Sequence, residues 1–199
     1  MKYSLRIVTL AMSFAVILLV GFGCYKASNE LAQNSGEIDK ASILSEAKKS
    51  GLIMDDQEIQ RMAATALTHP KNEKTLEDVS AYKALDWSSW QSGALADVTG
   101  GGSFGLAHIH KTSGGFTIAA QMGGLPFPDE HSYYEGWLVR RGDNLSVIST
   151  GKALLVEDRF YNVYTTEENL EEYDFYVLTL ESDDLNPSPA KHLLEGVIE

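Results

Sequence analysis

The chain has 199 residues, of which 44% are hydrophobic and 22% are charged, and this composition is that of an ordinary globular protein. It excludes collagen-like, low-complexity and polytopic membrane proteins. Sixteen basic residues against 28 acidic ones give a formal net charge of -12, a surface that repels phosphate backbones, so no nucleic-acid partner is expected. The single cysteine excludes an intramolecular disulfide and every multi-cysteine metal site.

The amino terminus has the pattern of an export signal. Lys2 and Arg6 precede an apolar run from Ile7 to Phe22, and no acidic residue appears before Glu30. A cleaved signal has an apolar core of roughly 7–15 residues and a membrane-spanning helix needs roughly 20, so the length of the run leaves both open. The basic residues stand before the run, which places the residues after it outside the cytoplasm.

Cys24 ends this segment at the point where a bacterial lipoprotein signal places its acylated cysteine. Gly23 is the small residue that such a signal needs, whereas Gly21 replaces the usual branched aliphatic residue. We expect lipidation at Cys24, with an uncleaved signal anchor and simple secretion as the alternatives. Residues 1–23 hold two basic residues and no acidic one, so their removal leaves 14 basic against 28 acidic residues, a net charge of -14.

The exported part is expected to comprise a tether, a helical segment and a β-domain. Residues 24–37 are small and polar, which is typical of a flexible tether. Residues 38–92 are predicted to be helical, and residues 93–199 to form the β-domain. Three short helices are predicted: Ile38–Lys49, a second from Asp55 or Asp56 to His69, and a third from Thr75 toward Trp87.

Local sequence signals support these helix ends. Gly51 stands at the C-cap position of the first helix, and Pro70 stops the second. Thr75 followed by Asp78 resembles a capping box at the start of the third.

Short β-branched and aromatic segments follow Gly93, separated by turn residues. The predicted strands are Leu95–Val98, Ser103–Lys111, Phe116–Met122, Tyr133–Arg140, Leu145–Leu154, Phe160–Thr165 and Tyr173–Glu181, with room for an eighth near His192–Ile198. About seven strands in this pattern predict a mainly β fold with a carboxy-terminal immunoglobulin-like β-sandwich.

Four strings in this domain carry a family resemblance. They are Gly124-Leu125-Pro126, Tyr134-Glu135-Gly136-Trp137-Leu138-Val139, Ser149-Thr150-Gly151, and Phe175-Tyr176-Val177-Leu178-Thr179-Leu180-Glu181. In order and approximate spacing they resemble the extracytoplasmic domain of the anti-sigma-K factor family, over about Leu95 to Glu199. The resemblance implies an immunoglobulin-like sandwich and no catalytic residues. The matching residues are expected to be structural, with Tyr134 and Trp137 packed in the core.

The sequence departs from this family at its amino-terminal side. A complete family member has a cytoplasmic helical domain that grips the sigma factor, whereas only Met1 to Arg6 precede the apolar run here. We therefore expect that this chain does not hold a sigma factor directly. What the resemblance carries over is the fold and a sensing or scaffolding role.

The sharpest chemical motif is His108-Ile109-His110. Residues two apart on a strand share a face, so both imidazoles can point the same way and chelate copper or zinc, with His131 or a carboxylate completing the site. The alternative is that Ala107 and Ile109 face the core while the two histidines lie in solvent.

No other motif predicts chemistry. Arg141-Gly142-Asp143 has the composition of a hairpin turn. The acidic residues between Glu167 and Asp184 lack the regular spacing of a calcium loop and are expected to form a solvated rim. No serine lies in a nucleophile-elbow context, so neither an enzymatic activity nor a cofactor is expected.

Together these patterns predict a non-enzymatic bacterial cell-envelope protein. It is expected to be exported, to be attached to the membrane by a lipid or signal anchor, and to bind another envelope protein as a sensor or scaffold. The alternative function is a copper- or zinc-binding protein that uses the His108–His110 pair.

Overall fold

The computed structural model describes residues 39–65, 74–184 and 186–199. The predicted export signal and tether lie outside these residues. The helices are α3 (Lys40–Lys49), α4 (Asp56–Ala64) and α5 (Leu76–Lys83). The strands are β1 (Gln91–Asp97), β2 (Phe104–Thr112), β3 (Gly115–Gly123), β4 (Ser132–Arg140), β5 (Ser146–Lys152), β6 (Leu154–Val156), β7 (Arg159–Thr166), β8 (Phe175–Ser182) and β9 (Lys191–Val197).

The helices begin where their local sequence predicts. Asp55, and not Asp56, is the N-cap of α4, and its side chain accepts hydrogen bonds from the backbone N–H groups of Gln57 and Glu58. Thr75 and Asp78 form the predicted capping box of α5. Helix α4 ends earlier than predicted because Thr65 is extended, while residues 66–73 lie outside the described part of the chain.

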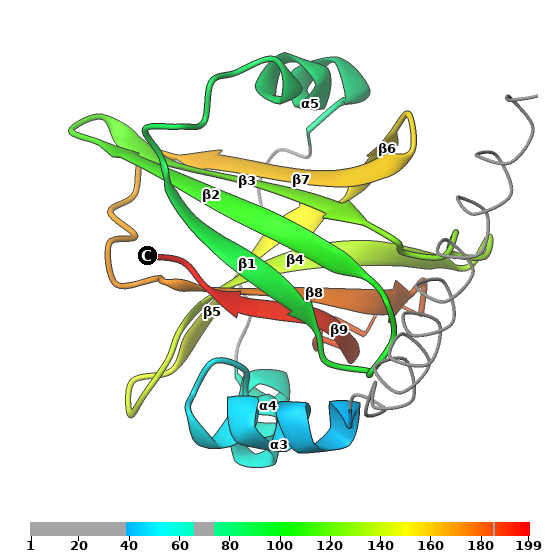
Figure 1. Ribbon diagram of the computed structural model, residues 1–199. Coiled ribbons are helices and arrows are strands. Elements are labelled where there is room, and N and C mark those ends of the chain that lie inside the picture. The colour runs from blue at the N-terminus through cyan, green and yellow to red at the C-terminus, as the bar shows by residue number, and fades with distance from the viewer. Residues whose placement is uncertain (1–38, 66–73, 185) are drawn as a thin grey trace, which may run out of the picture. The chain divides into compact units, whose positions relative to one another are not determined.

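The mainly β class and the preceding short helices are confirmed. All nine strands form one antiparallel sheet in the order β5-β4-β8-β9-β1-β2-β3-β7-β6 (Figure 1). The two edge strands, β5 and β6, are consecutive in the chain, and only Ala153 separates them. Because consecutive strands form the two edges, the ends of the sheet meet at Ala153 and the curled sheet is nearly closed.

This near-closure explains how the strands differ from the sequence-based expectation. The segment Leu145–Leu154 was predicted to be one strand, yet it contains β5, which pairs with β4, and the start of β6, which pairs with β7. The change of partner follows Gly151, whose φ of +86° suits glycine. A single curled sheet thus takes the place of the two separate sheets of the expected sandwich.

The inner face of the curled sheet holds the main hydrophobic core. Phe116, Ile118, Ala120 and Met122 project into it from β3, as their alternation predicts. Tyr134 is also buried there, in edge-to-face contact with Phe160.

A buried polar cluster interrupts this core. The Asn162 side-chain oxygen accepts hydrogen bonds from Thr150 Oγ1 at 2.5 Å and from Tyr176 OH at 3.0 Å. Its amide nitrogen donates to the carbonyl of Gly151 at 2.8 Å. Because Asn162 lies on β7 and the other residues lie on β5 and β8, this cluster ties opposite parts of the curled sheet together.

The helices cover two separate areas of the outer face (Figure 1). Met62 of α4 and Met54, two residues before the helix, cover one area. They pack with Trp137 of β4 and with Phe175 and Val177 of β8. On the other side, Val79 of α5 packs with Ala119, Tyr161 and Val163 of β3 and β7, together with partly buried Trp87 and Trp90. Residues Lys40 to Glu199 therefore form one compact unit.

Candidate functional site

The predicted histidine pair lies on the outer face of β2, and both rings contact tryptophans. The ring centroids of His108 and Trp87 lie 4.5 Å apart, and those of His110 and Trp90 lie 4.9 Å apart with nearly parallel planes. The shared face of the two histidines is thus as predicted, while Ala107 and Ile109 face the core.

The environment of His108 favours a neutral ring. Partial burial lowers the pKa of His108, because burial penalises the charged imidazolium. Its Nδ1 atom is buried without a hydrogen-bond partner among the described residues. The ring of His108 is held in place by its contact with Trp87.

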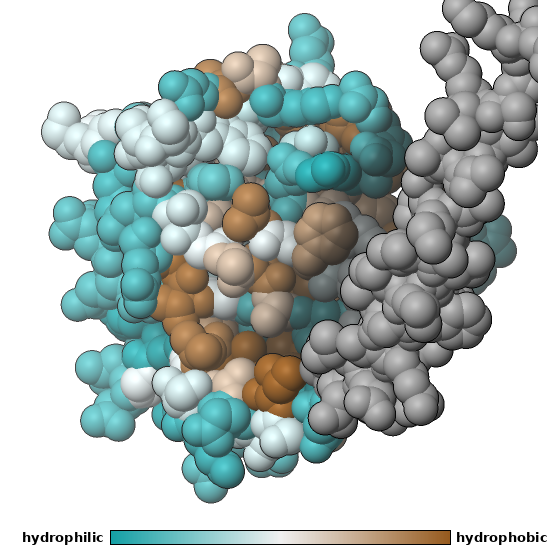
Figure 2. Space-filling view, in the orientation of Figure 1, coloured by the Kyte–Doolittle hydropathy of each residue, from teal (hydrophilic) through white to brown (hydrophobic). Residues whose placement is uncertain are grey.

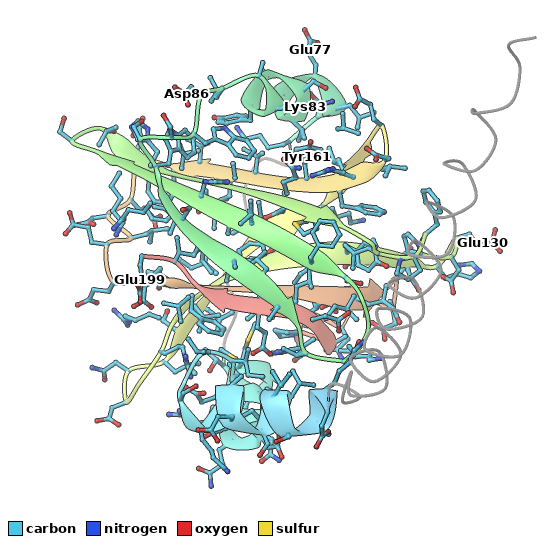
Figure 3. The ribbon with its side chains drawn as sticks, viewed as in Figure 1. Glu77, Lys83, Asp86, Glu130, Tyr161 and Glu199 are labelled. Atoms are coloured by element: carbon cyan, nitrogen blue, oxygen red, sulfur yellow. The ribbon has the colours of Figure 1, made fainter. Side chains whose placement is uncertain are left out.

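The third predicted metal ligand is elsewhere. His131 lies in the loop before β4, is exposed, and its Nε2 atom lies 3.4 Å from the carboxylate of Glu130. Figure 3 shows Glu130 at one end of the view and Asp86, which precedes Trp87, near the other. Within the described ranges, no three His, Cys, Asp or Glu side chains gather to hold a metal ion. The structure therefore does not bring His131 to the His108–His110 pair.

The residues of the four strings act as structural contacts. Tyr134 OH donates to the carbonyl of Pro126 at 2.7 Å, which ties β4 to the loop that begins with Gly124 and Leu125. The positive φ of Gly124 suits its place in that turn. Trp137 packs on the outer face, beneath α4, and not in the inner core with Tyr134.

A buried polar row continues from Trp137 along the outer face. Trp137 Nε1 donates to Thr179 Oγ1 at 2.7 Å, and Thr179 in turn donates to the carboxylate of Glu181. The same oxygen of Glu181, Oε1, also accepts a hydrogen bond from the backbone N–H of Ala190 at 2.9 Å. Two neutral donors thus serve one oxygen of this buried carboxylate.

Between the two helical covers, the outer face of β1 and β2 is open and apolar. Phe104 and Leu106 are 54% and 50% exposed. They pair across the ladder with Ala96 and Ala94, which are also exposed. We call these four residues the β1–β2 face, and Figure 2 shows hydrophobic side chains gathered on this side of the molecule. An exposed apolar patch of this kind is typical of an interaction surface.

A second feature is a pocket of about 380 Å³ between α3, α4 and β9. Lys48, Met54 and Ile59 line it from the helical side, and His192 and Glu195 line it from β9. We call it the His192 pocket. His192 and Glu195 are both buried, and Nδ1 of His192 lies 2.7 Å from Oε1 of Glu195.

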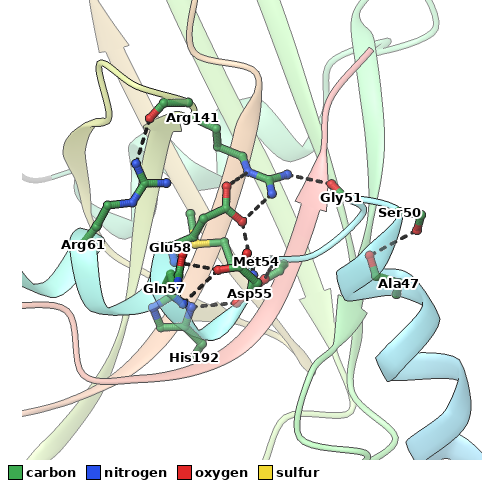
Figure 4. A network of polar contacts seen from close by, with 12 residues as sticks. Ala47, Ser50, Gly51, Met54, Asp55, Gln57, Glu58, Arg61, Arg141 and His192 are labelled. Atoms are coloured by element: carbon green, nitrogen blue, oxygen red, sulfur yellow. Dashed lines mark hydrogen bonds and ion pairs between the residues drawn. The ribbon is translucent and has the colours of Figure 1, made fainter.

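The helical wall of this pocket is fixed to the sheet by polar contacts (Figure 4). Oε2 of Glu195 accepts a hydrogen bond from the backbone N–H of Met54 at 2.6 Å. Arg141, after β4, donates to both carboxylate oxygens of Glu58, at 2.9 and 2.6 Å, and to the carbonyl of Gly51 at 2.6 Å. Its guanidinium also lies 4.5 Å from the centre of the Phe175 ring.

Sequence reasoning missed the His192–Glu195 pair for a structural reason. Strict alternation would place residues three apart on opposite faces of a strand. The ladder between β8 and β9 shifts register between Leu178 and Thr179, so that Leu178 pairs with Leu194 while Thr179 pairs with His192. This bulge turns His192 and Glu195 to the same face. The sequence of β9 alone does not indicate this shift in register, because the shift is defined by the pairing with β8.

The residues that were predicted to attach the protein to the membrane, including Cys24, lie outside the described part of the chain. In the described residues, no helix has the length and apolar composition that crossing a membrane requires.

No family model, curated protein or solved structure shows significant similarity to the chain. The resemblance to the anti-sigma-K factor family stays a prediction from the sequence.

Proposed function

We propose that this protein is an exported, membrane-tethered binding protein of the bacterial cell envelope. It is non-enzymatic and acts as a sensor or scaffold, with the β1–β2 face as the surface that docks another envelope protein. The exposure of Phe104 and Leu106 on an uncovered sheet face carries this proposal. The signal-like amino terminus and Cys24 support export and attachment.

The physical argument rests on the contrast between covered and uncovered parts of the sheet. The outer faces of β4, β8, β3 and β7 are packed against helices, whereas the β1–β2 face exposes two large apolar side chains. Ala94 and Ala96 have short side chains, so a partner could approach the sheet closely beside Phe104 and Leu106. Truncating a few central apolar side chains of such a surface removes most of the binding energy.

Site-specific photo-crosslinking in native membranes tests this proposal. A photoreactive residue at Leu106 is expected to trap one envelope protein in stoichiometric amounts. The same residue at Glu77, which Figure 3 shows on the outward side of α5, is the matched control and is expected to trap none.

A charge at the same position provides an independent check. Leu106→Lys is expected to reduce recovery of the partner about tenfold or more, because its docking would then bury an unpaired ammonium. Equal crosslinking from Leu106 and Glu77, or an undiminished yield with Leu106→Lys, would contradict the assignment of this face.

A further inference from the structure

We propose that the His192 pocket binds a small organic carboxylate, with the anionic group at His192 and Lys48 and a short apolar chain against Met54 and Ile59. This inference concerns a different surface from the β1–β2 face and does not depend on the protein partner. The His192 pocket has a volume of about 380 Å³, near the lower end for ligand pockets, and therefore suits a molecule of a few carbon atoms.

The orientation of His192 is the first step of the argument. Both oxygens of Glu195 are occupied, Oε1 by Nδ1 of His192 and Oε2 by the N–H of Met54. Because the carboxylate accepts at Nδ1, that nitrogen carries a proton. Nε2 has no hydrogen bond to another described residue, and the ring lines the pocket. A buried imidazole is therefore held with one nitrogen committed and the other available to a ligand.

The charge of the lining is the second step. Lys48 and Lys191 contribute two cationic side chains, and His192 becomes a third when protonated. Nζ of Lys48 lies 2.6 Å from Oδ1 of Asp56, whose side chain is 82% exposed, so a ligand would share this ammonium with an exposed carboxylate. The one carboxylate of the lining, Glu195, is committed to His192 and Met54. This basic lining contrasts with a chain whose net charge is -12. A bound carboxylate would accept a hydrogen bond from Nε2–H of the protonated ring, whose charge Glu195 balances on the other side.

The apolar wall is the third step. Met54, which is buried, together with Ile59 and Val98 supplies apolar side chains to the lining. A fully hydrated inorganic anion would gain nothing from this wall. A carboxylate with a short alkyl chain satisfies both sides, because its head group meets the cations and its chain covers the apolar side chains.

The test uses the full-length protein in a mild detergent, with butyrate as the probe and saturation-transfer NMR as the measurement. Butyrate is expected to give a saturable signal, and butylamine, which has the same chain length and the opposite charge, a signal at least about tenfold weaker. Empty detergent micelles provide the blank for both compounds.

Lys48→Gln and its neighbour Lys49→Gln form a matched pair of variants. Lys48 lines the pocket, whereas Lys49 is largely exposed beside Glu46. Lys48→Gln and His192→Gln are each expected to weaken butyrate binding about tenfold, the usual loss for a charged hydrogen bond. Lys49→Gln is expected to bind as the unmodified protein does.

Several results would overturn the inference. These are the absence of a saturable butyrate signal, equal binding of butylamine and butyrate, or equal affinities of the Lys48→Gln and Lys49→Gln variants. Circular dichroism checks the fold of each variant. Should His192→Gln fail to fold, the comparison of Lys48→Gln with Lys49→Gln decides the question, because neither lysine is buried.

Discussion

At the scale of single residues, Gly136 shows how tightly the buried polar cluster is built. A Cβ atom at this position would lie 2.3 Å from both Asn162 Oδ1 and Tyr176 OH, and 2.4 Å from Thr150 Oγ1. Gly136→Ala is therefore expected to displace groups that hydrogen-bond one another and to lower the free energy of unfolding by about 2–3 kcal/mol. Urea denaturation measures the change.

The control for this substitution is Gly102→Ala in the loop before β2. A Cβ atom there meets no other atom within 4 Å, so the expected change is within about 0.5 kcal/mol. Equal effects of the two substitutions would mean that the polar cluster tolerates the added methyl group.

Because Tyr176 of the same cluster is fully buried, we expect the protein to lose stability at alkaline pH. Full burial raises the pKa of Tyr176 well above its ordinary value of 10.0. Above pH 10 the unfolded chain releases the Tyr176 proton while the folded protein retains it. The contribution of neutral Tyr176 to the free energy of unfolding is therefore complete below pH 10 and falls as the pH rises above it. The slope is about 1.4 kcal/mol per pH unit for each such tyrosine.

Tyr176→Phe separates this residue from the others. Burial also raises the pKa values of Tyr133, Tyr134 and Tyr164, so some alkaline loss is expected to remain in the variant. The free energy of unfolding, measured in urea across the alkaline range, should show a shallower decline for the variant. Parallel curves would mean that Tyr176 does not retain its proton.

At the scale of elements, we expect the adjacent residues Arg140 and Arg141 to differ in how much they stabilise the fold, because their ion pairs differ in burial. The Arg141 and Glu58 side chains are 20% and 14% exposed, and Arg141 also holds the carbonyl of Gly51. Arg141→Ala is expected to lower the free energy of unfolding by about 2–3 kcal/mol, because it leaves a largely buried carboxylate and a carbonyl without their charged donor. Arg140 pairs with the exposed Glu172, so Arg140→Ala is expected to cost less than about 1 kcal/mol.

Amide hydrogen exchange identifies which element Arg141 secures. In the Arg141→Ala variant, the N–H of Met54 should lose protection while the N–H groups of β3 keep theirs, since the change loosens α3 and α4 and not the sheet. A uniform loss of protection across β3 and Met54 would point instead to a global effect.

The extent of prediction from sequence also differs between elements. The capping pairs Asp55–Glu58 and Thr75–Asp78 act within four residues, so their helix starts could be predicted. The division of Leu145–Leu154 could not, because it depends on partners in β4 and β7. The His108–His110 pair was predictable from alternation, whereas the His192 pocket required a register shift and two distant helices.

At the scale of the whole molecule, the near-closed sheet determines which surfaces remain available. Its inner face is filled by side chains, and two areas of its outer face are covered by helices. Helix α4 covers β4 and β8, and α5 covers β3 and β7, so neither helix covers the β1–β2 face that lies between them (Figure 1). The same arrangement creates the His192 pocket where α3 and α4 meet β9. Partner docking and ligand binding can thus occupy different surfaces of one compact unit.

The last prediction concerns attachment of this unit to the membrane. If Cys24 is lipidated, intact mass spectrometry of the membrane-extracted protein should show a chain that lacks residues 1–23 and carries a diacylglycerol group. Cys24→Ser should instead give the full chain of 199 residues without lipid, because serine has no thiol to acylate. Ser28→Ala, four residues further on, is the control and should be processed normally. An unprocessed, lipid-free wild-type chain in the membrane would establish the signal anchor, since the apolar run from Ile7 to Phe22 would then be the part that holds the protein there.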